Sequence, residues 1–273
     1  MQSSDPYRPP DSSLESQPEE VAFTLGSPQR VVLARGFQWY AEGFRVFTRN
    51  PGPWLLCMLI LFVLIIGVSF VPMPNEHFQL GNVLDTFLIA GLILGIYGQE
   101  KGEKFGVESL FTGFRHPQTL QLLMLGIVSM LLYGTVNYFM LNEPLQEFQQ
   151  NMESVTQNSA PSNEQISTML GYQATFYKHI FFSMLANIPV MMLFWFAIPL
   201  VVIHNVNAYE AMKLSFLGCV KNLPVMVIFL VLGIIFGIFA TIPLALGWFV
   251  FMPVLIGADY TGWKDIYTRQ AAR

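Results

Sequence analysis

The chain has 273 residues, of which 53% are hydrophobic and only 12% are charged, and its mean hydropathy is +0.48. A soluble domain of this length has too small an interior for so many apolar side chains, so the composition predicts an integral membrane protein. The net charge of −4 argues against a nucleic-acid-binding protein, because the chain has no excess of basic residues to neutralise phosphates.

Residues 1–30 form a polar segment that precedes the apolar part of the chain. The segment begins MQSSDPYRPPDSSLESQPEE, which has neither the basic start nor the apolar centre of a signal peptide. A composition so rich in Ser, Pro, Asp and Glu buries too little apolar surface to fold by itself. We therefore expect a disordered cytoplasmic tail, followed by a membrane domain over residues 31–273.

Three short segments, at about 36–49, 104–115 and 207–221, place apolar and charged residues on opposite sides of a helix. In the first segment, four aromatic residues share one side: Phe37, Tyr40, Phe44 and Phe47. These segments are too short to cross a membrane and too apolar on one side to lie in water. We expect them to lie as amphipathic helices in the cytoplasmic surface of the membrane.

Each of these segments ends at a basic residue that a proline follows closely, in the sequences RNP, RHP and KNLP. Proline can begin a helix without leaving an amide unpaired, because the first-turn amides have no partner within the helix. We therefore predict a repeated unit with three corners, in which the basic residue stays at the lipid headgroups and the proline begins a membrane helix. The three pairs are Arg49 and Pro51, Arg115 and Pro117, and Lys221 and Pro224.

The apolar runs are long enough for six membrane-spanning helices, each of which needs about 20 residues. The last uncharged run would be about 51 Å long as a single helix at 1.5 Å per residue, so it has to fold back at TIPLALGW. The predicted fold is an all-α integral membrane protein with six transmembrane helices in three hairpins. The expected spans are 54–71, 80–98, 119–141, 179–203, about 223–241 and about 244–260.

The basic residues indicate how these spans are oriented. With a cytoplasmic amino terminus, thirteen of the fourteen Lys and Arg residues fall on one side of the membrane, and only Lys178 falls on the other. By the positive-inside rule, we expect both termini in the cytoplasm and a long outer loop at about 142–173. Cys57 and Cys219 then lie near the reducing face, so we expect no structural disulfide.

Three stretches carry a resemblance to a known family: GFQWYAEGFRVFTRNPGPWL, AGLILGIYGQEKGEKFGVESLFTGFR, and PLVVIHNVNAYEAMKLSFLGCVKNLPVMVIFL with the following FMPVLIGADYTGWKDIY. In these stretches the chain resembles an uncharacterised family of six-pass proteobacterial inner-membrane proteins. More distantly, the repeated hairpins are similar to the membrane domain of some bacterial glycerophosphodiester phosphodiesterases. The resemblance implies a location in the bacterial inner membrane and transfers no catalytic residues.

Asp85 is the first candidate for a functional site, because an acid inside an apolar run is costly and usually serves a function. It lies near the outer end of the second span, where it could also reach the headgroups. Asn137, Asn187 and Thr241 lie in the outer half or near the middle of later spans. These four residues could line an outward-facing polar cavity, but hydrogen bonds between helices are the alternative use of the last three.

Other chemical signals are weak. No phosphate-binding loop, catalytic triad motif or metal-ligand array is present, so we expect neither enzymatic activity nor a cofactor or metal. Asp259 and Asp265, together with Lys264, flank the end of the sixth apolar run. We expect these three residues to form a solvated or interfacial cluster.

Two functional hypotheses remain open. In the first, the protein is non-catalytic and binds membrane lipids or another membrane protein through its cytoplasmic amphipathic helices and its acidic outer loop. In the second, it is a small transporter or channel with an outward-facing polar cavity in which Asp85 is the key group. The polar residues gather mainly in the outer half of the predicted spans, which favours the first hypothesis. Neither hypothesis involves nucleic acid.

Overall fold

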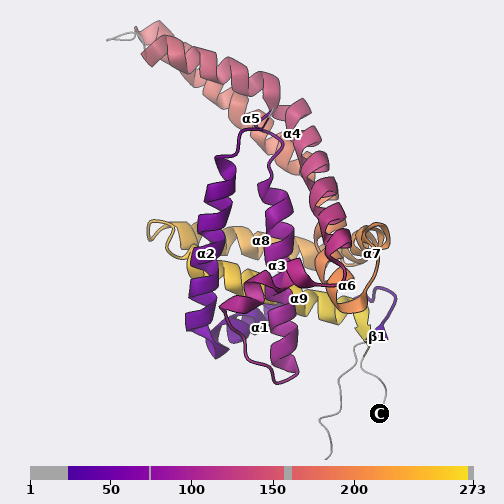
Figure 1. The fold of residues 1–273 in the computed structure, drawn as a ribbon. Helices are drawn as coiled ribbons and strands as arrows, with labels where there is room; N and C mark the ends of the chain where they lie inside the picture. The colour runs from indigo at the N-terminus through magenta and orange to yellow at the C-terminus, as the bar shows by residue number, and fades with distance from the viewer. Residues whose placement is uncertain (1–23, 74, 157–161, 270–273) are drawn as a thin grey trace, which may run out of the picture.

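The computed structural model describes residues 24–73, 75–156 and 162–269 of the chain (Figure 1). Most of the predicted tail, residues 1–23, lies outside the described residues. The described chain is helical apart from turns and one short pair of antiparallel strands, β1 (Thr24–Leu25) and β2 (Thr268–Arg269). The helical class expected from the composition is confirmed.

Five helical segments are long and apolar enough to cross a membrane. Two of these segments do not coincide with a single helix. The third is most of α4 (Thr119–Thr156), and the fourth runs through most of α5 (Asn163–Phe194) and all of α6 (Ala197–His204). The other three are α2 (Pro51–Ser69), α3 (Gly81–Glu100) and α8 (Leu223–Thr241). The fold is thus that of a multi-pass helical membrane protein.

The sixth predicted span corresponds to α9 (Trp248–Tyr267), which is not one of these five segments. Its second half carries Asp259, Lys264 and Asp265, and it is also the most thoroughly buried of the long helices. TIPLALGW forms the expected turn before α9. The polar residues of α9 have partners or line a cavity inside the protein, and α1, α2, α3 and α8 pack on this helix.

Figure 1 shows how the helices are arranged. In that view α2 and α3 run up and down, whereas the hairpin of α8 and α9 runs from side to side across them. Beyond the α2–α3 connection, α4 and α5 continue together as a two-helix arm, in which Phe148 and Phe176 stack with ring centroids 5.0 Å apart. We name this end of the molecule the arm end, and the opposite end, where α3 finishes, the base end. The predicted outer loop is therefore largely helical.

The three predicted amphipathic segments correspond to α1 (Arg35–Arg49), the 3₁₀ helix η1 (Val107–Arg115) and α7 (Ala208–Lys221). The aromatic stripe of α1 does not lie on one free face. Tyr40 and Phe47 are buried in the protein, whereas Phe37 and Phe44 are more than half exposed, at 57% and 52%. The reason is that α1 packs along α9, so one part of its apolar side meets protein and the other part faces outward.

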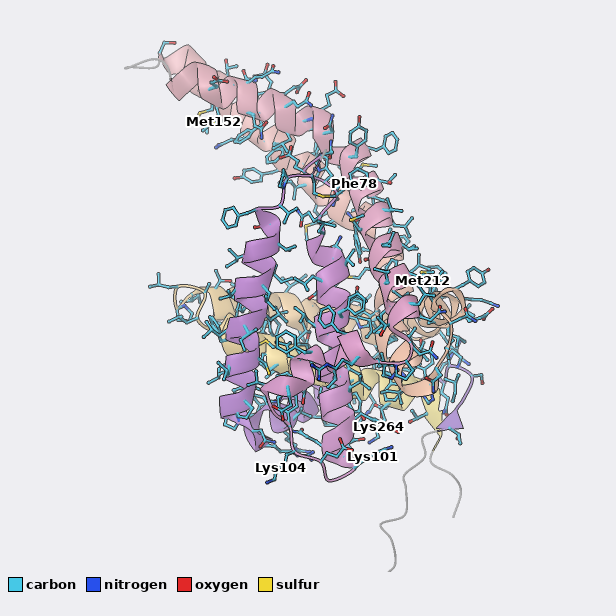
Figure 2. All side chains as sticks on the ribbon, viewed as in Figure 1. Phe78, Lys101, Lys104, Met152, Met212 and Lys264 are labelled. Atoms are coloured by element: carbon cyan, nitrogen blue, oxygen red, sulfur yellow. The ribbon has the colours of Figure 1, made fainter. Side chains whose placement is uncertain are left out.

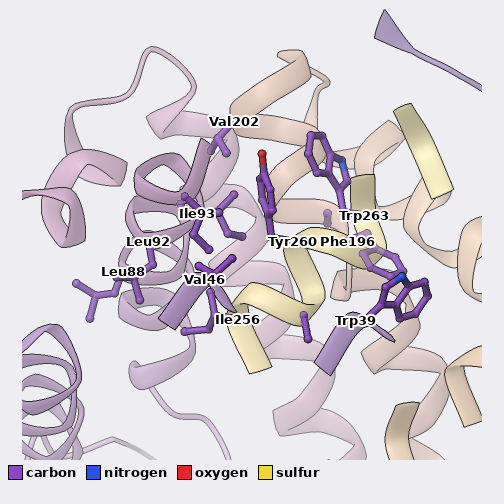
Figure 3. Close-up of a cluster of buried hydrophobic side chains, with 14 of the residues drawn as sticks. Trp39, Val46, Leu88, Leu92, Ile93, Phe196, Val202, Ile256, Tyr260 and Trp263 are labelled. Carbon is purple, nitrogen blue, oxygen red and sulfur yellow. The ribbon is translucent and has the colours of Figure 1, made fainter. Parts of the chain in front are cut away.

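The contact between α1 and α9 forms the centre of the core, shown in part in Figure 3. Trp39 of α1 and Trp263 of α9 are fully buried there, together with Phe196 from the segment between α5 and α6. The two helix backbones approach closely because Gly43 faces Gly257 without an intervening side chain. The Tyr40 hydroxyl extends this core to α8 by donating a 2.9 Å hydrogen bond to the Phe229 carbonyl.

Asn222, which lies between α7 and α8, holds the segment before α1. Its side chain accepts a 2.9 Å hydrogen bond from the Val31 amide and donates one of 2.8 Å to the Gln29 carbonyl. The side chain is almost completely buried, and the paired strands β1 and β2 lie nearby in the chain. Residues 24–31 are therefore ordered against the rest of the protein, although the sequence predicts disorder as far as residue 30.

Candidate functional site: an acidic cavity between the helices

A cavity of about 290 Å³ lies between α3, α4, α5, α6 and α9. Asp85 of α3 and Asp259 of α9 both line it, and no Lys, Arg or His does. The other polar groups on its wall come from Asn82, Thr86, Ser129 and Tyr133, and the remaining lining is apolar or aromatic. Two carboxylates and an apolar wall in one cavity are the most distinctive chemical feature of the described chain.

Asp85 lies in the second turn of α3 and faces the cavity. This residue is partly buried, and it lines the cavity. Within the described part of the chain, its carboxylate has no hydrogen-bond or ion-pair partner. An acid in such a place is expensive unless a ligand or a proton neutralises it.

Asp259 lies on the opposite wall and does have a partner. Its Oδ1 accepts a 3.0 Å hydrogen bond from the indole Nε1–H of Trp195. It shares one face of α9 with Met252, Leu255 and Ile256, at the three- and four-residue spacing of a helix, and these residues also line the cavity. Asp259 therefore does not belong to the solvated cluster that the sequence predicts, because this face of α9 points inward.

Lys264 and Asp265, which the sequence predicts to cluster with Asp259, form contacts elsewhere. Lys264 pairs with Glu100 at the end of α3, with an Nζ–Oε1 distance of 2.8 Å. Asp265 accepts a 2.7 Å hydrogen bond from Trp39 Nε1 and forms an ion pair with Arg35. These contacts hold the last turns of α9 to α3 and α1, and they leave Asp259 as the acid of α9 that lines the cavity.

A helix break forms part of the cavity wall. The chain is non-helical at Trp195 and Phe196, between α5 and α6, and the break is satisfied by Ser215 of α7. The Ser215 hydroxyl accepts a 2.9 Å hydrogen bond from the Phe196 amide and donates one of 2.8 Å to the Met192 carbonyl. Irregular backbone at membrane depth is tolerated where it is buried or lines a cavity, and discontinuous helices of this kind form binding sites in transporters.

A second cavity of about 380 Å³ lies next to the first one, between the α2–α3 connection, α3 and α4. Asn82 and Tyr133 line both cavities, so these two side chains lie between them. The second cavity is more polar, and its wall includes Glu76, His77 and Asn137. Polar groups therefore extend from the α2–α3 connection inward to Asp85.

The other polar candidates from the sequence have separate places. Asn137 of α4 accepts hydrogen bonds from Asn187 Nδ2 at 2.9 Å and from Ser183 Oγ at 2.8 Å, which join α4 to α5. Thr241 lies at the end of α8, where its hydroxyl donates to the Gly237 carbonyl and accepts from Trp248 Nε1. The structure thus joins Asn187 to Asn137, which lines the second cavity, and places Thr241 in a different region.

The residues of the three corners lie at helix boundaries. α1 ends at Arg49 and α2 begins at Pro51, and α7 ends at Lys221 with Pro224 in the first turn of α8. η1 ends at Arg115, and Pro117 stands two residues before the start of α4. All three basic residues are exposed, and Lys221 donates a 2.6 Å hydrogen bond to the Pro28 carbonyl.

Comparisons with known proteins add no assignment, because no family model, curated protein or solved structure matches the chain. In the described ranges there is also no group of three or more His, Cys, Asp or Glu residues that could hold a metal ion.

Proposed function

We propose that the protein transports a small, positively charged organic solute, which binds between Asp85 and Asp259. The observation that carries this proposal is the cavity lined by two carboxylates and by no basic side chain. A bound cation would offset the cost of holding these carboxylates away from water. The helix break at Trp195 and the polar second cavity that adjoins the first one support movement of the solute rather than permanent storage.

The wall of the cavity favours an organic cation over a metal ion. Tyr133, Phe194 and Trp195 present aromatic rings, which attract ammonium groups. A cavity of about 290 Å³ is close to the lower end of the usual range for small-molecule sites.

We further propose that the protein lies in the bacterial inner membrane with its base end in the cytoplasm. Lys101, Lys104 and Lys264 lie together at the base end (Figure 2), and Lys178 is the basic residue on the arm. The resemblance seen in the sequence agrees with this location. Both termini are cytoplasmic in this proposal, whether the α8–α9 hairpin crosses the bilayer as a fifth and sixth span or returns within it.

The orientation can be tested by labelling cysteines in intact cells with a membrane-impermeant maleimide. The cysteine of the Lys178→Cys variant should be labelled from outside the cell. The cysteine of the Arg115→Cys variant should be labelled only after the cells are permeabilised. The natural cysteines, Cys57 and Cys219, should not be labelled, because both are buried. Burial also raises the pKa of the Cys219 thiol to about 12, which keeps it in the unreactive thiol form. If Arg115→Cys were labelled in intact cells and Lys178→Cys were not, the proposed orientation would be wrong.

Transport can be tested with proteoliposomes that contain the full chain and carry an inside-negative potassium diffusion potential. A panel of radiolabelled cations, from tetramethylammonium to tetrabutylammonium, should include at least one that accumulates above protein-free vesicles. Asp85→Asn should reduce its uptake about tenfold or more, because a neutral amide replaces the carboxylate and about 1.4 kcal/mol corresponds to each factor of ten.

The matched control is Glu210→Gln, since Glu210 is a surface acid of α7 with only a 3.5 Å ion pair to Lys213. This variant should transport like the unmodified protein. Equal uptake by Asp85→Asn, or no accumulation of any cation in the panel, would contradict the proposed function.

Binding of a lipid or protein partner at the base end is a second candidate function. It is favoured by the outward-facing aromatic residues Phe37 and Phe44 of α1, which are large and more than half exposed. This function does not use the acidic cavity. If it were the function of the protein, Asp85→Asn would not change the uptake of cations into the proteoliposomes.

A further inference from the structure

A groove on the outside of the helices lies next to the acidic cavity. It has a volume of about 440 Å³ and runs along α8, with α1 and α9 on its other sides. Its wall is almost entirely apolar and includes Phe229, Gly233, Gly237 and Phe251. The groove therefore offers space for hydrocarbon and very little for polar groups.

The few polar groups on this wall are already paired. The Tyr40 hydroxyl donates to the Phe229 carbonyl, and the Thr241 hydroxyl lies between the Gly237 carbonyl and the indole of Trp248. A ligand in the groove would consequently be held by apolar contact alone.

The groove faces the region that lipid would occupy. α8 has the highest hydropathy of the five apolar segments, at 2.9. Ile234 and Ile238, which line the groove, are 53% and 61% exposed, and Ile242 beyond them is 70% exposed. An exposed surface of this kind is stable in hydrocarbon, so the groove is accessible from within the bilayer.

One layer of side chains separates the groove from the acidic cavity. Trp195 and Leu255 line both spaces. The ring of Trp195 meets Phe229 on the groove side, with centroids 5.8 Å apart, and its indole N–H bonds to Asp259 on the cavity side. Displacement of the Trp195 and Leu255 side chains would therefore connect an apolar space to the carboxylate of Asp259.

From this juxtaposition we infer that the solute is an amphipathic cation, which enters sideways from the lipid with its hydrocarbon part in the groove and its charge directed to Asp259. This inference rests on the proposed function for the sign of the charge, and it adds the apolar body and the route. A charged group beside a hydrocarbon-sized space matches such a molecule better than a compact hydrophilic ion.

The inference can be tested by equilibrium binding to the full chain in nanodiscs, with empty nanodiscs subtracted. The probes are radiolabelled tetraphenylphosphonium, which has a large apolar body, and tetramethylammonium, which does not. We expect tetraphenylphosphonium to bind at least tenfold more tightly. Asp259→Asn should weaken the binding of both probes at least fivefold.

Filling the groove should separate the two probes. A Cβ at Gly237 would lie at ordinary contact distance, 3.5 Å from Trp248 and 3.8 Å from Phe251, so Gly237→Ala should fold and Gly237→Leu should occupy the groove. We expect Gly237→Leu to weaken the binding of tetraphenylphosphonium at least fivefold and Gly237→Ala to weaken it about twofold. Neither variant should change the binding of tetramethylammonium. The matched control is Gly67→Leu on α2, where an added Cβ meets nothing within 4 Å.

The outcomes distinguish this inference from the function on which it rests. The lateral route is wrong if neither groove variant selectively weakens the binding of tetraphenylphosphonium, or if tetramethylammonium binds as tightly as tetraphenylphosphonium. In that case, uptake that depends on Asp85 still supports transport. If Gly237→Leu does not fold, Gly237→Ala decides the question through the same selective weakening. If neither probe binds and no cation is taken up, both proposals fail.

Discussion

Gly43→Ala should lower the midpoint of thermal unfolding in mild detergent by about 6–12 °C, which corresponds to roughly 3 kcal/mol for a chain of this size. A Cβ at this position would lie 2.2 Å from the Val254 carbonyl oxygen and 2.7 Å from the Ala258 amide nitrogen. Both are backbone atoms of α9, so no rotation of a side chain can relieve the clash. The methyl group can be accommodated only if α1 moves away from the helix on which the core is built.

The measurement is the fraction of protein that stays monodisperse in size-exclusion chromatography after heating to a series of temperatures. Gly52→Ala provides the matched control, because it makes the same change at the start of α2, where an added Cβ meets nothing within 4 Å. The control should keep or slightly raise the midpoint, since alanine favours helix over glycine. Equal midpoints for the two variants would show that α1 does not pack on α9 as described.

Ser215→Ala should cost roughly 2–4 kcal/mol of stability, because it removes both hydrogen bonds that satisfy the break between α5 and α6. The Phe196 amide and the Met192 carbonyl would then remain unpaired in a buried place, where water does not replace the lost hydroxyl. Ser215 is fully buried, so the loss arises from the pairing rather than from a surface effect.

The same heating assay measures this loss. Ser69→Ala is the control, because the Ser69 hydroxyl also donates to a carbonyl, that of Ile66, but at the exposed end of α2. That change should be within about 0.5 kcal/mol of neutral. A Ser215→Ala protein as stable as the control would indicate that the helix break is satisfied in another way.

The local features of the fold follow closely from the sequence. Pro51 and Pro224 begin helices where the pattern predicts, since the conformation of proline acts on its own neighbours. The length and apolarity of five segments are likewise local properties. The side-to-side course of α8 and α9 is not local, because it depends on where α1 and α3 lie when α9 packs between them.

The candidate site was predictable only in part. Asp85 is conspicuous as an acid in an apolar run, and the structure places it at the cavity. Asp259 could have been found from its helical spacing with Met252, Leu255 and Ile256, but its place near the end of an apolar run favoured a surface position. Ser215 carries no local signal at all, because its role depends on a break in a helix that precedes it by about 20 residues.

The packing of α1 on α9 also bears on how the protein is made. The ribosome completes α1 about 200 residues before α9, which at roughly 5–20 residues per second is a delay of about 10–40 s. During that time Trp39 and Tyr40 have no α9 to cover them, although both are buried in the finished protein. The surface of the membrane can hold the amphipathic α1 meanwhile. The membrane surface, where the sequence predicts that this helix lies, is then also the place that holds it during synthesis.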